Sequence, residues 1–190
     1  MDTACLNYRL TDKERDEFEK NGFFVVEDAL SPTIVQDLTK LVDRVDTDYR
    51  NAMGLSPCEV LELIDFVGKH DLFLELLDWP RTFPKVWEIL GWHIQLYHSH
   101  IQITPPVAPE QRAMIQRLGW HQDSGRLNLE LEGNPRPRVS LKVGYFLTDT
   151  SELGRGNFWA VPGSHLHNEL ELPPDGVSDP PSALAVQARA

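Results

Sequence analysis

The period of the hydrophobic pattern changes halfway along the chain, and this change constrains the fold more than any other feature. In the first half, apolar residues recur at helical spacing, as in Ile34, Val35, Leu38, Leu41, Val42 and Val45. In the second half, residues 139–147 alternate between an apolar face and a mixed face, as strands do. Helices followed by strands predict an α+β or mainly β domain with a helical front.

Local signals place the helices of this front. A capping box formed by Thr11 with Glu14 and a stop at Gly22 predict a helix over residues 12–21. An N-cap serine followed by proline begins the next helix at 31–32. We expect two more helical stretches, at 57–77 and 84–91, and one short strand at 23–26.

The strands of the second half are expected at residues 92–104, 139–147 and 157–161. The first has a polar stretch on one face, which suits a barrel that holds a ligand, although a bulge would give the same pattern. Which face of this strand points into the barrel stays unassigned. We expect a single domain over 1–190, with a helix-rich front (1–91), barrel strands (92–172) and a Pro-rich tail (173–190).

The composition limits the classes of partner that we expect for this chain. The net charge is −11, and clustered Lys and Arg are missing, so nucleic acid is not expected as a partner. No apolar run reaches the roughly 18 residues that a membrane span needs, and the N-terminus is too polar for a secretory signal. With only Cys5 and Cys58, a reduced, cytoplasmic setting is the expectation, and a disulfide between them stays open.

The segment with the clearest chemistry is Gly119-Trp120-His121-Gln122-Asp123. Residues two apart in an extended chain point the same way, so His121 and Asp123 can converge on one metal ion. They would be two of the ligands of a 2-His-1-carboxylate site, which leaves open positions on Fe(II). A lone His-x-Asp is more often a surface hydrogen-bonded pair, so the surrounding motifs decide.

Those motifs resemble the phytanoyl-CoA dioxygenase family of Fe(II)/2-oxoglutarate-dependent oxygenases. Three matching segments occur in order: LTDKERDEFEKNGFFVVEDALSPTIVQDL near the N-terminus, WHQD at 120–123, and VGYFLTDTSELGRGNFWAVPGSH at 143–165. The resemblance implies a double-stranded β-helix, or jelly-roll barrel, with the N-terminal helices outside. It also implies Fe(II), the co-substrate 2-oxoglutarate, O₂ and a small-molecule substrate that is hydroxylated while 2-oxoglutarate becomes succinate.

The resemblance also assigns residues. His121 and Asp123 map onto two iron ligands, and His100 and Thr104 lie on the strand from which the family contacts 2-oxoglutarate. Many members have Lys at the position of Thr104 and Trp at that of Gly144. Lys142, on the same face as Gly144, is therefore our candidate for the missing cation. His98 and Arg126 are candidates for contacting the substrate, against structural roles as a hydrogen-bonded histidine and a surface cation.

The chain departs from the family after the PGSH motif. The family's third iron ligand is a later His, followed by an Arg for 2-oxoglutarate, whereas here no His follows His167 and the later Arg is Arg189. We expect the sequence to stop before the distal ligand and the last strands; His165 and His167 are the remaining substitutes. The rival functions are a non-catalytic jelly-roll binding module and a cupin-like enzyme such as an isomerase. The substrate itself is not specified.

Overall fold

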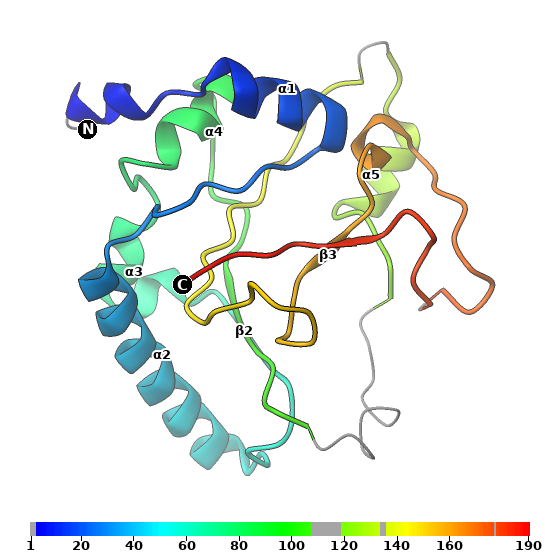
Figure 1. The fold of residues 1–190 in the computed structure, drawn as a ribbon. Helices are drawn as coiled ribbons and strands as arrows, with labels where there is room; N and C mark the ends of the chain where they lie inside the picture. The colour runs from blue at the N-terminus through cyan, green and yellow to red at the C-terminus, as the bar shows by residue number, and fades with distance from the viewer. Residues whose placement is uncertain (1–2, 108–118, 134–135, 177) are drawn as a thin grey trace.

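The computed structural model describes residues 3–107, 119–133, 136–176 and 178–190 (Figure 1). Most helices of the described residues lie in the first half, and the second half consists mainly of short strands and long irregular segments. The elements in chain order are η1 (Thr3–Tyr8), α1 (Asp12–Asn21), α2 (Pro32–Met53), β1 (Leu61–Ile64), η2 (Val67–Lys69), α3 (Asp71–Glu75), α4 (Phe83–Leu90), β2 (His100–Ile103), α5 (Gly125–Glu130), β3 (Trp159–Ala160), η4 (Ser164–Leu166) and β4 (Leu184–Ala185).

The first helix begins and ends where the sequence predicts. Thr11 accepts a hydrogen bond from the Glu14 amide, and the Glu14 carboxylate accepts one from the Thr11 amide, so the capping box is complete. Gly22 ends α1 in the left-handed region, at φ 84°. The Ser31 hydroxyl caps α2 in the same way by accepting from Ile34. Residues 23–26, predicted as a strand, have irregular backbone.

The predicted helix over 57–77 is wrong for most of its length. Residues 61–64 form β1, in which Leu61 and Leu63 are buried while Glu62 and Ile64 are exposed. This strand pairs antiparallel with β2, and Ile64 lies opposite His100. The leucine-rich pattern fits either period locally, but the backbone hydrogen bonds offered by β2 select the strand. Within this range, α3 is α-helical as predicted and η2 is one short 3-10 turn.

The predicted strands are present in shortened form or without a ladder. Of 92–104, residues 100–103 form β2, and of 157–161, residues 159–160 form β3, which pairs with β4. Residues 139–147 form no ladder in the described part of the chain. The described residues therefore contain two small two-stranded sheets. The jelly-roll barrel stays a prediction.

A helical layer packs on one side of these segments and fixes their position. Leu38 and Leu41 of α2 and Phe73 of α3 form the buried core cluster. Ile101 of β2 and Leu147 pack against this cluster from the other half of the chain. Tyr145 is anchored nearby, because its hydroxyl bonds with the Thr82 hydroxyl at 2.7 Å. Both β2 and the 139–147 segment are thus held against the helices by apolar residues.

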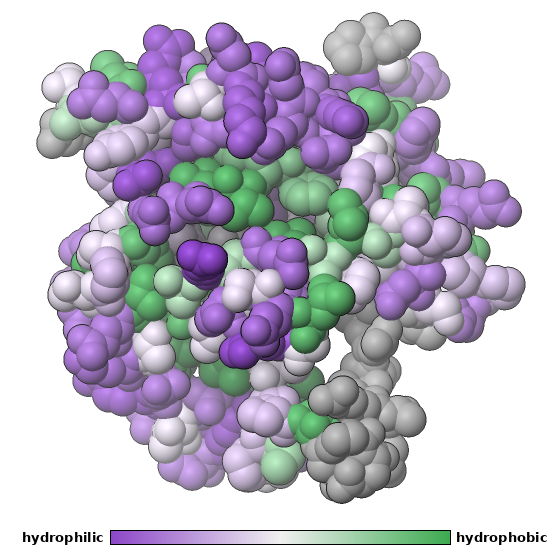
Figure 2. Space-filling model, in the orientation of Figure 1, coloured by the Kyte–Doolittle hydropathy of each residue, from purple (hydrophilic) through white to green (hydrophobic). Residues whose placement is uncertain are grey.

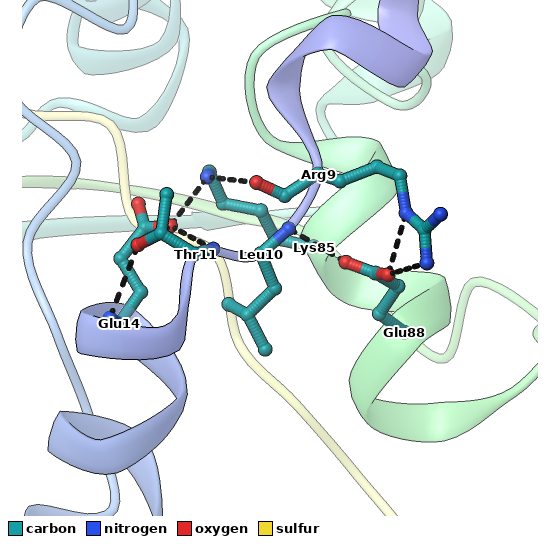
Figure 3. Close-up of polar contacts among 6 residues, drawn as sticks. All are labelled: Arg9, Leu10, Thr11, Glu14, Lys85 and Glu88. Carbon is teal, nitrogen blue, oxygen red and sulfur yellow. Dashed lines mark hydrogen bonds and ion pairs between the residues drawn. The ribbon is translucent and has the colours of Figure 1, made fainter.

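The N-terminal segment is fastened to α4 by charged groups (Figure 3). Glu88 accepts hydrogen bonds from the Leu10 amide and the Arg9 guanidinium, at 2.6 and 2.8 Å. Lys85 binds Glu14 at 2.8 Å, and both side chains are largely buried. These contacts place α1 beside α4, as Figure 1 shows at the top of the molecule.

The surface is mixed in polarity. Figure 2 shows apolar side chains across the middle of one face, between hydrophilic surfaces.

Both cysteines are free, Cys5 buried and Cys58 exposed, so the structure contains no disulfide between them. Within the described residues, no helix combines the length and the apolar character required to cross a bilayer.

Candidate metal centre

The His121 and Asp123 side chains face each other, with imidazole Nε2 3.5 Å from carboxylate Oδ1. They lie just before α5, in irregular backbone rather than in a strand. The other ring nitrogen, Nδ1, is 2.8 Å from the backbone oxygen of Gly119. A carbonyl oxygen only accepts, so Nδ1 donates its proton there. In the neutral form of the ring, Nε2 then carries the lone pair, on the side that faces Asp123.

This arrangement fits two ligands of one metal ion. Adjacent ligands of an octahedral ion with bonds of about 2.1 Å lie about 3 Å apart, close to the observed 3.5 Å. A histidine that binds metal usually donates its second nitrogen to a carbonyl or carboxylate, as His121 does. Imidazole and carboxylate together suit Fe(II). Among the described residues, no cluster of three or more His, Cys, Asp or Glu side chains suits a metal ion.

Lys142 also contacts the Asp123 carboxylate. Its Nζ is 2.5 Å from Oδ2, the oxygen that does not face His121. The hydrogen bond from Lys142 holds the pKa of Asp123 below its usual value, against the opposing effect of partial burial. Asp123 is therefore ionised at neutral pH, with Oδ1 toward the His121 ring and Oδ2 toward the Lys142 ammonium.

His98 and His100 lie in the same electrostatic cluster. His98 Nε2 is 3.3 Å from His100 Nδ1, and the two rings are stacked. Burial lowers the pKa of His100, and the positive charge of Lys142 lowers it further. The charge of His98 contributes to the low pKa of Asp123. Three segments that are far apart in sequence, at 98–100, 121–123 and 142, thus come together.

Two other predicted site residues have different surroundings. Thr104 follows β2 with an exposed side chain and lies near Gly156, where an added Cβ would come within 3.7 Å of it. Arg126, on α5, pairs with Glu130 at 3.2 Å and is 92 % exposed. The contact of Thr104 with 2-oxoglutarate and that of Arg126 with the substrate stay predictions.

The two histidines of the PGSH region serve the fold rather than the cluster around Asp123. The His165 ring packs against Phe18 of α1, at 6.1 Å between ring centroids, and burial lowers its pKa. His167 is exposed and its carbonyl oxygen accepts a hydrogen bond from Gln122. Gln122 was not singled out from the sequence, although its place between two residues on a common side signals an opposite orientation.

The sequence matches a known protein family. The family model described as phytanoyl-CoA dioxygenase matches residues 18–183, which is most of the 190-residue chain. No curated protein and no solved structure matches the chain. Members of the matched family are dioxygenases that depend on Fe(II) and 2-oxoglutarate. The chain therefore belongs to the phytanoyl-CoA dioxygenase family.

Proposed function

We propose that this chain is an Fe(II)/2-oxoglutarate-dependent dioxygenase that hydroxylates a small organic molecule and converts 2-oxoglutarate to succinate. The family membership supports this class of reaction. The observation that carries it to particular residues is the 3.5 Å approach of His121 Nε2 to Asp123 Oδ1. Sequence separation alone does not require the two side chains to meet; in the structure they do, at a site open to water, where they are 51 % and 41 % exposed.

His121 and Asp123 are the proposed holders of the iron. When bound, the iron supplies the redox chemistry with O₂ and 2-oxoglutarate. The hydrogen bond to Gly119 selects the tautomer with the proton on Nδ1, which leaves Nε2 as the ring nitrogen that would bind the iron. The low pKa of Asp123 keeps its carboxylate charged at neutral pH, as a ligand must be.

The neighbouring ammonium suits an anionic co-substrate. Lys142 lies against Asp123, and an ammonium is a strong donor to carboxylates. We propose that Lys142 and His100 contact 2-oxoglutarate, together with Thr104. A jelly-roll barrel is the proposed frame for these residues, and a cytoplasmic location is part of the same proposal. The substrate is proposed only as a small organic molecule, since fold does not fix substrate.

The direct test is succinate release from 2-oxoglutarate by the purified chain with added Fe(II) and air. We expect slow release by the wild type and none by His121→Ala or Asp123→Asn. His93 is an exposed histidine outside the cluster, so His93→Ala is the matched control and keeps the wild-type rate. No succinate from a folded wild type that binds Fe(II) would favour the non-catalytic binding module.

Lys142 has its own test. Replacing it with Ala removes the ammonium beside Asp123, and we expect the KM for 2-oxoglutarate to rise about tenfold, since a charged hydrogen bond contributes about 1.5–3 kcal/mol before solvent screening. Steady-state kinetics with varied 2-oxoglutarate measure this. An unchanged KM would remove Lys142 from the co-substrate site.

A further inference from the structure

Gln122, between the two proposed iron ligands, is bound to a different part of the chain. Its amide nitrogen donates to the Ser164 carbonyl at 2.9 Å and to the His167 carbonyl at 3.0 Å. Two carbonyl oxygens accept only, so the NH₂ end of the amide must face them. One side chain thus joins the 121–123 segment to both ends of η4.

The turn that Gln122 binds is itself anchored to α1. The Gly163 amide donates to the Asn21 carbonyl at 3.0 Å. The His165 ring lies directly over Gly22, so closely that an added Cβ would approach His165 Nδ1 to 2.5 Å. Arg136 also donates to the His167 carbonyl. The turn is therefore a fixed support rather than a loose loop.

The 121–123 segment needs such a support. Residues 119–122 have irregular backbone, so no strand ladder aligns them, and Asp123 begins a turn. Ligand atoms that bind one ion must be held within about 0.5 Å of their working positions. The hydrogen bonds of Gln122 act between the two ligands, where a shift of the backbone would separate His121 from Asp123.

We propose that Gln122 is a positioning residue: its two hydrogen bonds to the 164–167 turn hold His121 and Asp123 where they bind one metal ion. The identity of that ion as Fe(II) rests on the proposed function. That Gln122 holds the 121–123 segment in place does not rest on the proposed function, because its hydrogen bonds are present in the metal-free chain.

The test uses the full chain with Gln122→Glu, which replaces the donor by a charged acceptor, and Gln122→Met, which removes the donor without adding charge. Gln187 provides a matched control, because its amide also donates to a backbone carbonyl, that of Ser151, at 2.8 Å. Gln187→Glu therefore loses the same kind of bond outside the 121–123 segment.

Two measurements decide the proposal. Anaerobic calorimetry with Fe(II) alone should show about tenfold weaker binding for both Gln122 variants and unchanged binding for Gln187→Glu. Amide hydrogen exchange of the metal-free chain should be faster at 119–124 and 163–167 in the Gln122 variants alone, with the rest of the chain unchanged.

The contrary outcomes are distinct. Unchanged exchange at 119–124 would show that Gln122 does not fasten the segment, and uniformly faster exchange would show a general role in stability. Faster local exchange with unchanged Fe(II) affinity would refute positioning. If the wild type binds no Fe(II), the proposed function fails, and the exchange data alone then decide whether Gln122 fastens the segment.

Discussion

The ion pair between Lys85 and Glu14 allows a quantitative test of how the N-terminal helix is attached (Figure 3). Lys85 Nζ lies 2.8 Å from Glu14 Oε2 and 3.2 Å from the Arg9 carbonyl. The side chains of Lys85 and Glu14 are only 9 % and 17 % exposed. Because water reaches this pair poorly, removing one partner leaves the other charge incompletely solvated.

The expected cost follows from this burial. Breaking a buried ion pair from one side costs about 3–5 kcal/mol. Glu14 keeps its hydrogen bonds with Thr11 and some contact with water, so we expect Lys85→Met to lower the free energy of unfolding by about 2–3 kcal/mol. Glu14→Gln retains the capping box, and a double-mutant cycle should give a coupling energy of about 1–2 kcal/mol.

Urea unfolding followed by tryptophan fluorescence measures these values, with an unchanged m-value as the sign that only stability has changed. The same helix provides the control pair, Lys13 and Glu17, which lie 3.7 Å apart and are 85 % and 41 % exposed. Its coupling energy should be below about 0.5 kcal/mol. If the coupling of Lys85 with Glu14 is no larger than that of the exposed pair, the reasoning from burial is wrong.

Two further predictions concern the same region. Gly22→Ala should destabilise the chain by about 1–3 kcal/mol, because φ is 84° and the new Cβ would meet the His165 ring; an unchanged melting temperature would contradict this. Burial works to raise the pKa values of Glu14 and Glu88, but hydrogen bonds from Lys85 and Thr11, and from Leu10 and Arg9, lower them on balance. Their stabilisation is therefore present above about pH 4.5 and is lost as the pH falls through the lowered pKa values. The urea midpoint of the double variant Glu14→Gln, Glu88→Gln should change less with pH below that value, and an equal slope would refute the assignment.

The structure shows where local sequence signals suffice. The bounds of α1 depend on Thr11, Glu14 and Gly22, which act within four residues of the helix end. The stretch 57–77 was misread because its leucines fit a helix and a strand alike. The choice depended on β2, some forty residues away, whose backbone groups pair with β1.

The candidate site likewise has one part that local sequence signals predict and one part that they do not. His121 and Asp123 were predicted from a two-residue spacing, and the neighbouring carbonyl of Gly119 needs only local chain geometry. The placing of Lys142 beside Asp123, however, depends on contacts with the distant helical layer, through Leu147 and Tyr145.

By itself the sequence predicted the ends of α1, the start of α2, the close approach of His121 to Asp123, and the family, because each depends on residues close together in the chain or on motifs in order. Only the tertiary structure decided that β1 is a strand, that Lys142 binds Asp123, and that Gln122 binds the 164–167 turn. These contacts join residues 19 to 45 positions apart or lie between strands, and such pairings form only when burial of the common core brings the segments together.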